Sequence, residues 1–179
     1  ETLEIRLDAN GSFSPENAVG CLERLSRFSV HSIEQPVKAG QPEEMRRICA
    51  ISPIPIGLDE ELIGTRTFEE AEKLVSFIRP QYLILKPSLC GGFSGADAYI
   101  DIARRRDIGW WATSALESNI GLAEIAGWIA AKKTSLPQGL GTGLLYSNNI
   151  ESPLEMRGEC LWYNPMAVWQ SIESLPWRN

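Results

Sequence analysis

Short apolar runs alternate with longer amphipathic segments along most of the chain. This pattern predicts strands at residues 3–7, 30–33, 54–58, 82–85, 109–113 and, more weakly, 138–140. Helices are predicted between them, at 14–28, 41–51, 67–78, 94–106 and 118–133, and Pro15 and Pro42 stand in first turns, where proline is favoured. Such alternation is typical of a parallel sheet with crossover helices. After residue 143 the pattern decays into an aromatic-rich tail.

One polar or flexible residue marks the end of each predicted strand. These residues are Asp8, Glu34, Asp59, Lys86, Ser114 and Gly139. Their even spacing is close to the roughly 30 residues that one βα unit of an eight-stranded barrel occupies. The spacing therefore places all six on the carboxyl-end rim of the sheet, where barrel loops converge on one site. Since no glycine-rich phosphate loop follows the first strand, we predict an α/β fold, a partial (β/α) barrel rather than a doubly wound sheet.

Three carboxylates on neighbouring strands indicate a metal site at this rim. If Asp8, Glu34 and Asp59 lie close together, their charges demand either protonation or a cation. Oxygen ligands without histidine or cysteine favour a hard ion, most simply Mg²⁺, with Mn²⁺ as an alternative. Lys86 adds a cation beside this site, which suits a reaction that removes a proton next to a substrate carboxylate. A single acid at a strand end is more commonly a loop residue or helix cap, so the prediction depends on the set.

Composition and charge narrow the function classes. The 179 residues are 44% hydrophobic and 22% charged, with 17 Lys and Arg against 23 Asp and Glu, a net charge of −6. This acidic balance gives no support to nucleic-acid binding. No run approaches the roughly 18–20 apolar residues of a membrane helix, and no signal peptide is visible. Four cysteines without a Cys-x-x-Cys pair predict reduced thiols in a cytoplasmic protein.

Other catalytic arrangements find little support. His31 is the only histidine and lies at the start of its predicted strand, on the wrong side of a barrel for the rim. Without a partner histidine, Cys90 lacks the base that a nucleophilic cysteine needs. We therefore expect His31 to be structural, and Gly91 and Gly92 to permit a tight turn.

Four motifs resemble, in order and spacing, the barrel of the enolase superfamily, and more closely its muconate lactonizing enzyme subgroup. They are Leu7-Asp8-Ala9-Asn10, Ile33-Glu34-Gln35-Pro36, Leu58-Asp59-Glu60-Glu61 and Leu85-Lys86-Pro87. The segment 113–122 is most similar to the seventh strand of o-succinylbenzoate synthases. The resemblance implies a barrel domain at 1–145 covering about strands 3 to 8, and a tail at 146–179 that packs on an N-terminal capping domain.

The resemblance also implies roles for individual residues. Asp8, Glu34 and Asp59 are expected to bind Mg²⁺, and Lys86 to stabilise the enediolate. Supporting or substrate-contacting positions are expected at Asn10, Glu60, Ser114, Leu116 and Gly139.

The implied reaction is the syn-dehydration of a cyclohexadiene carboxylate to o-succinylbenzoate in menaquinone synthesis. N-acylamino acid racemases and dipeptide epimerases remain alternatives, although Gly139-Leu140-Gly141 stands where the dipeptide epimerases carry Asp-x-Asp. The expected partner is a small carboxylate substrate, and the protein is a candidate homo-oligomer.

The family's general base is absent from this sequence. It is the second lysine of a Lys-x-Lys motif on the second barrel strand. That strand would end one βα repeat before Asp8, a position that falls before residue 1. We therefore expect the chain to begin at the third strand and to lack its base and capping domain. A non-catalytic fragment or binding module remains the alternative of a different class.

Overall fold

The computed structural model describes residues 3–132, 134–141 and 145–171. The described chain divides into two compact units, residues 1–111 and 112–179. Each unit is described by itself below.

The first unit is built from alternating strands and helices. The strands are β1 (Arg6–Asp8), β2 (Ser32–Glu34), β3 (Ile56–Leu58) and β4 (Tyr82–Leu85), and β5 (Gly109–Ala112) reaches the boundary of the unit. The helices are α1 (Pro15–Leu25), α2 (Pro42–Ile51), α3 (Phe68–Ile78) and α4 (Gly92–Arg106), with the 3₁₀ turns η1 (Ser26–Phe28) and η2 (Glu60–Leu62).

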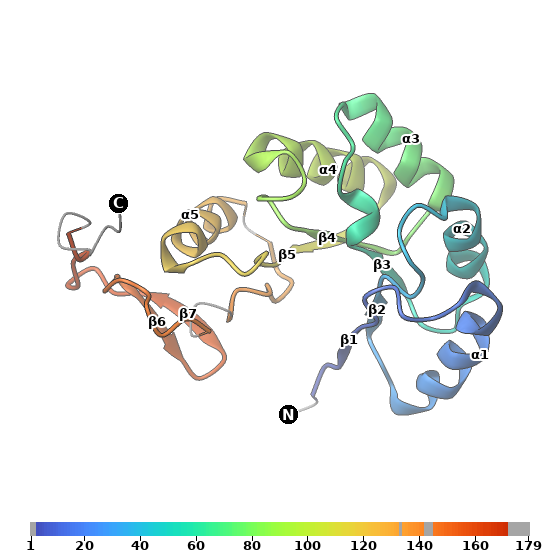
Figure 1. The fold of residues 1–179 in the computed structure, drawn as a ribbon, viewed down its shortest axis with the longest axis horizontal. Coiled ribbons are helices and arrows are strands. Elements are labelled where there is room, and N and C mark those ends of the chain that lie inside the picture. Colours follow the sequence, from blue (N-terminus) through green and yellow to red (C-terminus); the bar gives the residue numbers. More distant parts are fainter. Residues whose placement is uncertain (1–2, 133, 142–144, 172–179) are drawn as a thin grey trace. The chain divides into compact units, whose positions relative to one another are not determined.

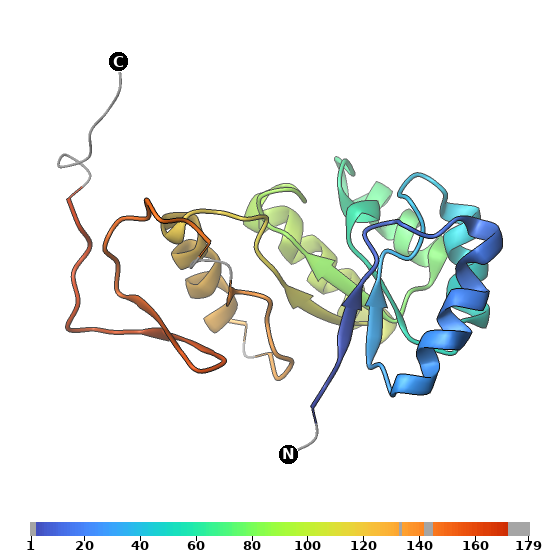
Figure 2. The same cartoon turned by 60° about the horizontal axis from the view of Figure 1, so that its bottom comes forward.

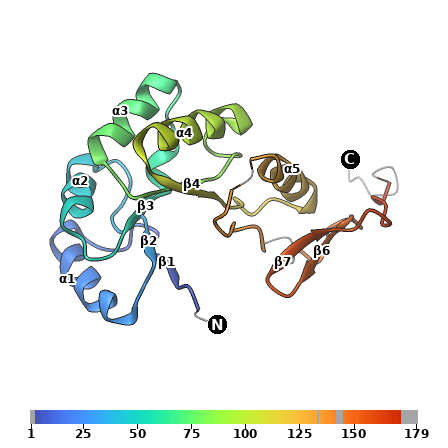
Figure 3. The same ribbon diagram turned by 180° about the vertical axis from the view of Figure 1, so that it is seen from behind.

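The strands form a curled sheet in the order β1-β2-β3-β4-β5, and neighbours from β1 to β4 are paired in parallel. Figures 1 and 3 show helices α1 to α4 on the outer side of this curve. Figure 2 shows the first two strands running side by side in the same direction. The predicted α/β partial barrel is thus confirmed.

A buried apolar layer holds this arrangement together. Ile33, Ile56, Leu58, Leu83 and Leu85 are at most 1% exposed, as expected where helices cover a parallel sheet. The same burial makes the strands rigid supports for the loops that follow them. The predicted helices begin and end within a few residues of the observed ones.

The second unit contains α5 (Asn119–Ala130) and an antiparallel hairpin of β6 (Leu154–Arg157) and β7 (Cys160–Tyr163). The hairpin lies in the segment that the sequence showed only as an aromatic-rich tail. The sixth predicted strand, at 138–140, is reduced to one isolated bridge between Gly139 and Thr113. Its two nearby glycines, Gly139 and Gly141, supply no side chains to pack against a neighbour, which weakens a strand.

Each helix of the described residues is too short or too polar to cross a lipid bilayer.

Candidate metal centre

The strand register of the first unit explains how the three acids meet. Asp8 is paired with Glu34 across β1 and β2, so their side chains leave the sheet at the same level. Glu34 is paired with Gly57, and Asp59 lies two residues further along the same strand path. Because side chains alternate with a period of two, Asp59 points to the same face as its neighbours.

The resulting carboxylate cluster is compact. One carboxylate oxygen from each of Asp8, Glu34 and Asp59 lies within 4.8 Å of the others. Asp59 is 2% exposed, Glu34 is half-buried and Asp8 is exposed. The cluster therefore offers three oxygen donors on one side and an approach from solvent on the other.

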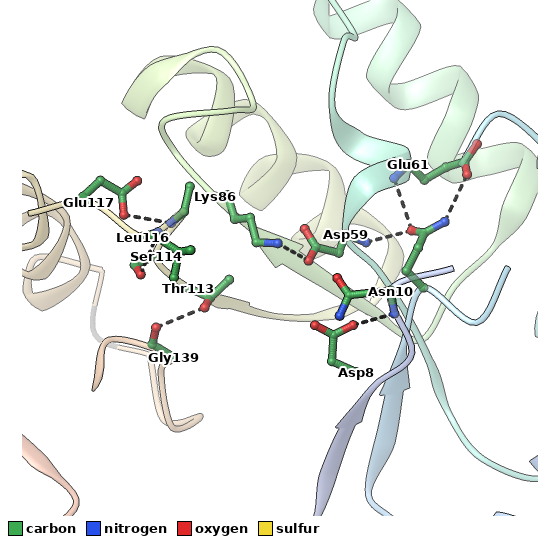
Figure 4. A network of polar contacts seen from close by, with 12 residues as sticks. Asp8, Asn10, Asp59, Glu61, Lys86, Thr113, Ser114, Leu116, Glu117 and Gly139 are labelled. Carbon is green, nitrogen blue, oxygen red and sulfur yellow. Dashed lines mark hydrogen bonds and ion pairs between the residues drawn. The ribbon is translucent and has the colours of Figure 1, made fainter. Parts of the chain in front are cut away.

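Lys86 extends the site on the next strand. In the pairing of β3 with β4, Leu58 faces Leu83, so Lys86 stands two positions further along its strand than Asp59 does along β3. Its Nζ donates a hydrogen bond and ion pair to Asp59 Oδ2 (Figure 4). The Lys86 side chain is 18% exposed.

The close approach of these charged side chains shifts their pKa values. Burial, followed by the charges of Asp8 and Asp59, raises the pKa of Glu34 to about 7. Burial also raises the pKa of Asp59 to about 6, although the hydrogen bond from Lys86 opposes the shift. Burial lowers the pKa of Lys86, but the hydrogen bond and charge of Asp59 and the nearby acids outweigh it, so the net shift is upward. Repelling carboxylates beside a protonated lysine form a site that a divalent cation stabilises.

Two predicted supporting residues lie at this cluster. The backbone N–H of Asn10 donates to Asp8 Oδ1 at 2.9 Å, which holds that carboxylate against its own loop (Figure 4). Glu60 Oε2 is buried and finds no hydrogen-bond partner among the described residues. The charge of Glu60 acts on Glu34 and Asp59, and a buried, unpartnered carboxylate oxygen in such a place fits a bound cation. The donor set, all oxygen, matches Mg²⁺ or Mn²⁺.

The remaining three predicted residues lie in the second unit and are joined there. Ser114 N donates to Gly139 O at 3.2 Å, and Leu116 N donates to Ser114 Oγ at the same distance. Leu116 has a φ of 65° and its carbonyl accepts a hydrogen bond from Tyr146 Oη at 2.6 Å. Holding a leucine in the left-handed region costs energy, so this turn is fixed by its surroundings. The structure brings these residues together, and their contact with substrate stays a prediction.

Two further residues beside the carboxylate cluster have no role assigned by the sequence: Gln35, and Glu61, which the sequence leaves ambiguous. Gln35 and Glu61 are 1% and 7% exposed, and their side chains join the loops that follow β2 and β3. Both residues stand close to Glu34 and Asp59 in the sequence motifs, which indicates that they lie near the cluster. The motifs do not indicate which groups their side chains hydrogen-bond.

His31 and the cysteines, which the sequence predicts to have no catalytic role, lie in structural environments. His31 Nδ1 lies 3.0 Å from Ser32 Oγ, and its Nε2 lies 3.2 Å from the hydroxyl of Tyr82. All four cysteines are free, and burial raises the pKa of the Cys90 thiol to about 11. A thiol of that pKa is a poor nucleophile at neutral pH.

Comparisons with known proteins identify the family. Residues 1–162 match the family described as Enolase C-terminal domain-like. The chain is 56% identical over 161 residues to o-succinylbenzoate synthase of Desulfotalea psychrophila, covering 90% of this chain and 44% of that protein. It is 32% identical over 114 residues to L-amino acid-D/L-Glu epimerase of Sulfurimonas denitrificans, covering 64% of this chain and 33% of that protein.

A solved structure of MenC from Desulfotalea psychrophila resembles the fold with a TM-score of 0.85 at 57% identity, covering 89% of this chain and 44% of that one. The chain thus spans less than half the length of these relatives.

Proposed function

This chain belongs to the Enolase C-terminal domain-like family, and on that premise we propose that it supplies the metal site of an o-succinylbenzoate synthase. The proposed reaction is the Mg²⁺-dependent dehydration of a cyclohexadiene carboxylate, a step of menaquinone synthesis. The single observation that carries the proposal is the carboxylate cluster, with oxygens within 4.8 Å of one another and Lys86 paired to one of them. The 56% identity to a protein of that name supports this substrate over others.

Asp8, Glu34 and Asp59 are the residues that would hold the ion, with the buried oxygen of Glu60 beside them. When bound, Mg²⁺ neutralises negative charge that develops on the substrate carboxylate. The Asp8 side of the cluster is exposed, so we propose that substrate approaches from there.

Lys86 acts, in this proposal, as a fixed positive charge. Its ammonium is paired with Asp59, and in this proposal it stabilises an anion rather than accepting a proton. In the reaction the C–H bond next to the carboxylate breaks, its electrons form a carbon–carbon double bond, and the hydroxyl leaves as water after taking up a proton. The family resemblance implies that a lysine of a Lys-x-Lys motif removes the proton. The 179 residues contain no such motif, and we propose that the whole protein supplies that lysine outside them.

We further propose that Ser114, Leu116 and Gly139 contact the substrate through their loop, partly by backbone groups. Their mutual hydrogen bonds support this role, because they order the loop before substrate arrives. The four free cysteines support a cytoplasmic location.

A substrate panel tests the proposal. The whole protein that contains this chain is incubated with the cyclohexadiene precursor and, separately, with N-acylamino acids and dipeptides in deuterated buffer. We expect Mg²⁺-dependent formation of o-succinylbenzoate at a kcat/KM at least tenfold above that of any α-deuterium exchange. Exchange into an N-acylamino acid or a dipeptide without dehydration would assign the site to a racemase or epimerase instead. No reaction with any substrate would favour the binding-module alternative.

A further inference from the structure

Gln35 connects three loops of the metal centre through its backbone and side chain. It follows Glu34 at the end of β2 and is 1% exposed. Its backbone N–H donates to Gly57 O of β3 at 3.0 Å, and its carbonyl accepts from Gly11 N, after β1, at 2.6 Å. Its φ of 38° is unusual for a residue with a side chain. Such a conformation persists where the surroundings fix it.

The side-chain amide of Gln35 uses its full hydrogen-bonding capacity. Oε1 accepts from the backbone N–H groups of Asp59 and Glu61, both at 3.2 Å. Nε2 donates to Val37 O at 2.9 Å and to Glu61 Oε2 at 3.3 Å. An amide has two lone pairs and two N–H groups, so all four are occupied. Gln35 therefore has no group left to bind a cation or a substrate.

The bond to Asp59 is the one that reaches the metal centre. Asp59 lies directly after β3, and Gln35 supplies an acceptor for its buried backbone N–H. A buried N–H without an acceptor is unfavourable, so loss of this bond favours a turn of the Asp59 peptide and a displacement of the carboxylate attached to it. Glu61 completes the arrangement, because its carboxylate accepts from both Gln35 and Gly40 N.

We propose that Gln35 is a positioning residue that sets the place of the Asp59 carboxylate and thereby the affinity of the cluster for a divalent cation. It acts through the Asp59 and Glu61 peptides and touches neither cation nor substrate. The inference rests on the proposed function only in taking the cluster as a metal site.

Gln81 provides a matched control at the opposite end of the same strand. Its Oε1 accepts from the backbone N–H of Ile56, the first residue of β3, at 2.9 Å. Both Gln35→Leu and Gln81→Leu remove an amide oxygen that accepts from a backbone N–H at one end of β3, and Gln35→Leu also removes the bonds to Val37 and Glu61. Of the two amide oxygens, only that of Gln35 lies beside the carboxylates.

The experiment measures Mn²⁺ dissociation constants of the whole protein by electron paramagnetic resonance, together with the thermal midpoint of each variant. Removal of an outer-shell partner commonly costs 10–100-fold in metal affinity. We expect Gln35→Leu to weaken Mn²⁺ binding at least tenfold, and Gln81→Leu to change it less than twofold even if both lower the thermal midpoint.

A charge-swapped pair keeps the test decisive if Gln35→Leu does not fold. Gln35→Glu retains oxygens for the Asp59 and Glu61 N–H groups but places a new carboxylate against that of Glu61 and against the carbonyl of Val37. Adding Glu61→Gln restores a donor opposite it. We expect Gln35→Glu to weaken Mn²⁺ binding at least tenfold and the double variant to recover to within threefold of wild type.

Equal losses in Gln35→Leu and Gln81→Leu, or no recovery in the double variant, would overturn the proposal. Absence of Mn²⁺ binding by the wild-type protein would also contradict it. Normal Mn²⁺ binding without dehydration would count against the proposed reaction alone, because the comparison of variants uses no substrate.

Discussion

Carboxylate crowding at the rim makes the metal-free centre costly for the fold. The pKa of Glu34 rises to about 7 and that of Asp59 to about 6, chiefly because both are buried and face like charges. When the pKa of a carboxyl is higher in the folded than in the unfolded protein, the folded protein loses stability as the pH rises toward and through the folded-state pKa. The metal-free protein therefore stores unfavourable free energy at neutral and alkaline pH.

Glu34→Gln tests this cost. Between pH 5 and pH 8 the wild-type Glu34 becomes ionised, whereas the amide does not, so the variant stabilises the metal-free protein at pH 8 and changes it little at pH 5. We expect a gain of about 1–2 kcal/mol at pH 8, since one pKa unit corresponds to about 1.4 kcal/mol and partial exposure weakens the effect. Urea unfolding in a chelator measures it, with the exposed Glu43→Gln as control. A gain of equal size at both pH values would show that ionisation is not the cause.

Lys86→Met tests the role of the fixed positive charge. Loss of the ammonium removes the group that stabilises the developing anion, and we expect kcat to fall by about 10²–10⁴-fold. Steady-state kinetics of the whole protein measure this, with Lys73→Met on the exposed side of α3 as the matched control. A kcat within threefold of wild type would remove Lys86 from the mechanism.

The sequence predicts that Asp8, Glu34, Asp59 and Lys86 lie together because each follows a strand of one repeating βα unit, and parallel strands bring such positions to the same edge. Sequence reasoning could not reach Gln35, because the value of that side chain lies in four bonds to backbone and side-chain atoms on separate loops. It also could not foresee that Leu116 adopts a positive φ.

At the scale of elements, strands and helices of the first unit follow from apolar periodicity and from caps such as Thr67, whose hydroxyl accepts from Glu70 N at the start of α3. Apolar periodicity did not predict the outcome at 138–140 or the hairpin of β6 and β7. The segment 138–140 has too few side chains to pack against a neighbouring strand, and it forms only one isolated bridge. The hairpin carries exposed aromatic residues, so its sequence lacks the alternation of apolar and polar residues that predicts a strand.

Gly95, in the first turn of α4, packs closely against the loop that joins β4 to this helix. A Cβ at this position would lie 1.9 Å from the carbonyl oxygen of Cys90, so backbone must move. We expect Gly95→Ala to destabilise the protein by about 1–3 kcal/mol. Gly127→Ala in α5 meets nothing within 4 Å, and should stabilise by up to about 1 kcal/mol because alanine favours helix. Urea unfolding of both variants measures this, and a stable Gly95→Ala would contradict the packing of α4.

At the scale of the whole molecule, the chain spans 44% of the length of its Desulfotalea relative. The hairpin exposes Trp162 and Tyr163 by 51% and 64%. We propose that the tail at 146–179, of which the structure describes 146–171, packs on the N-terminal capping domain that the family resemblance implies.

Hydrogen–deuterium exchange tests that packing. We expect the amides of β7 to be protected at least tenfold more in the whole protein than in residues 1–179 alone, since burial of a hairpin suppresses local opening. Helix α2 serves as internal control and should be unchanged. Equal protection of β7 in both would contradict the proposed contact.

In the proposed function, the carboxylate cluster binds the ion on which dehydration depends. The most direct measurement is the Mg²⁺ dependence of o-succinylbenzoate formation by the whole protein carrying Asp59→Asn, with Glu43→Gln as the control carboxylate. Loss of a ligand charge at the buried corner of the cluster should reduce kcat/KM at least 10²-fold and raise the Mg²⁺ concentration needed for half-maximal rate, while Glu43→Gln behaves as wild type. Normal Mg²⁺-dependent dehydration by Asp59→Asn would contradict the account.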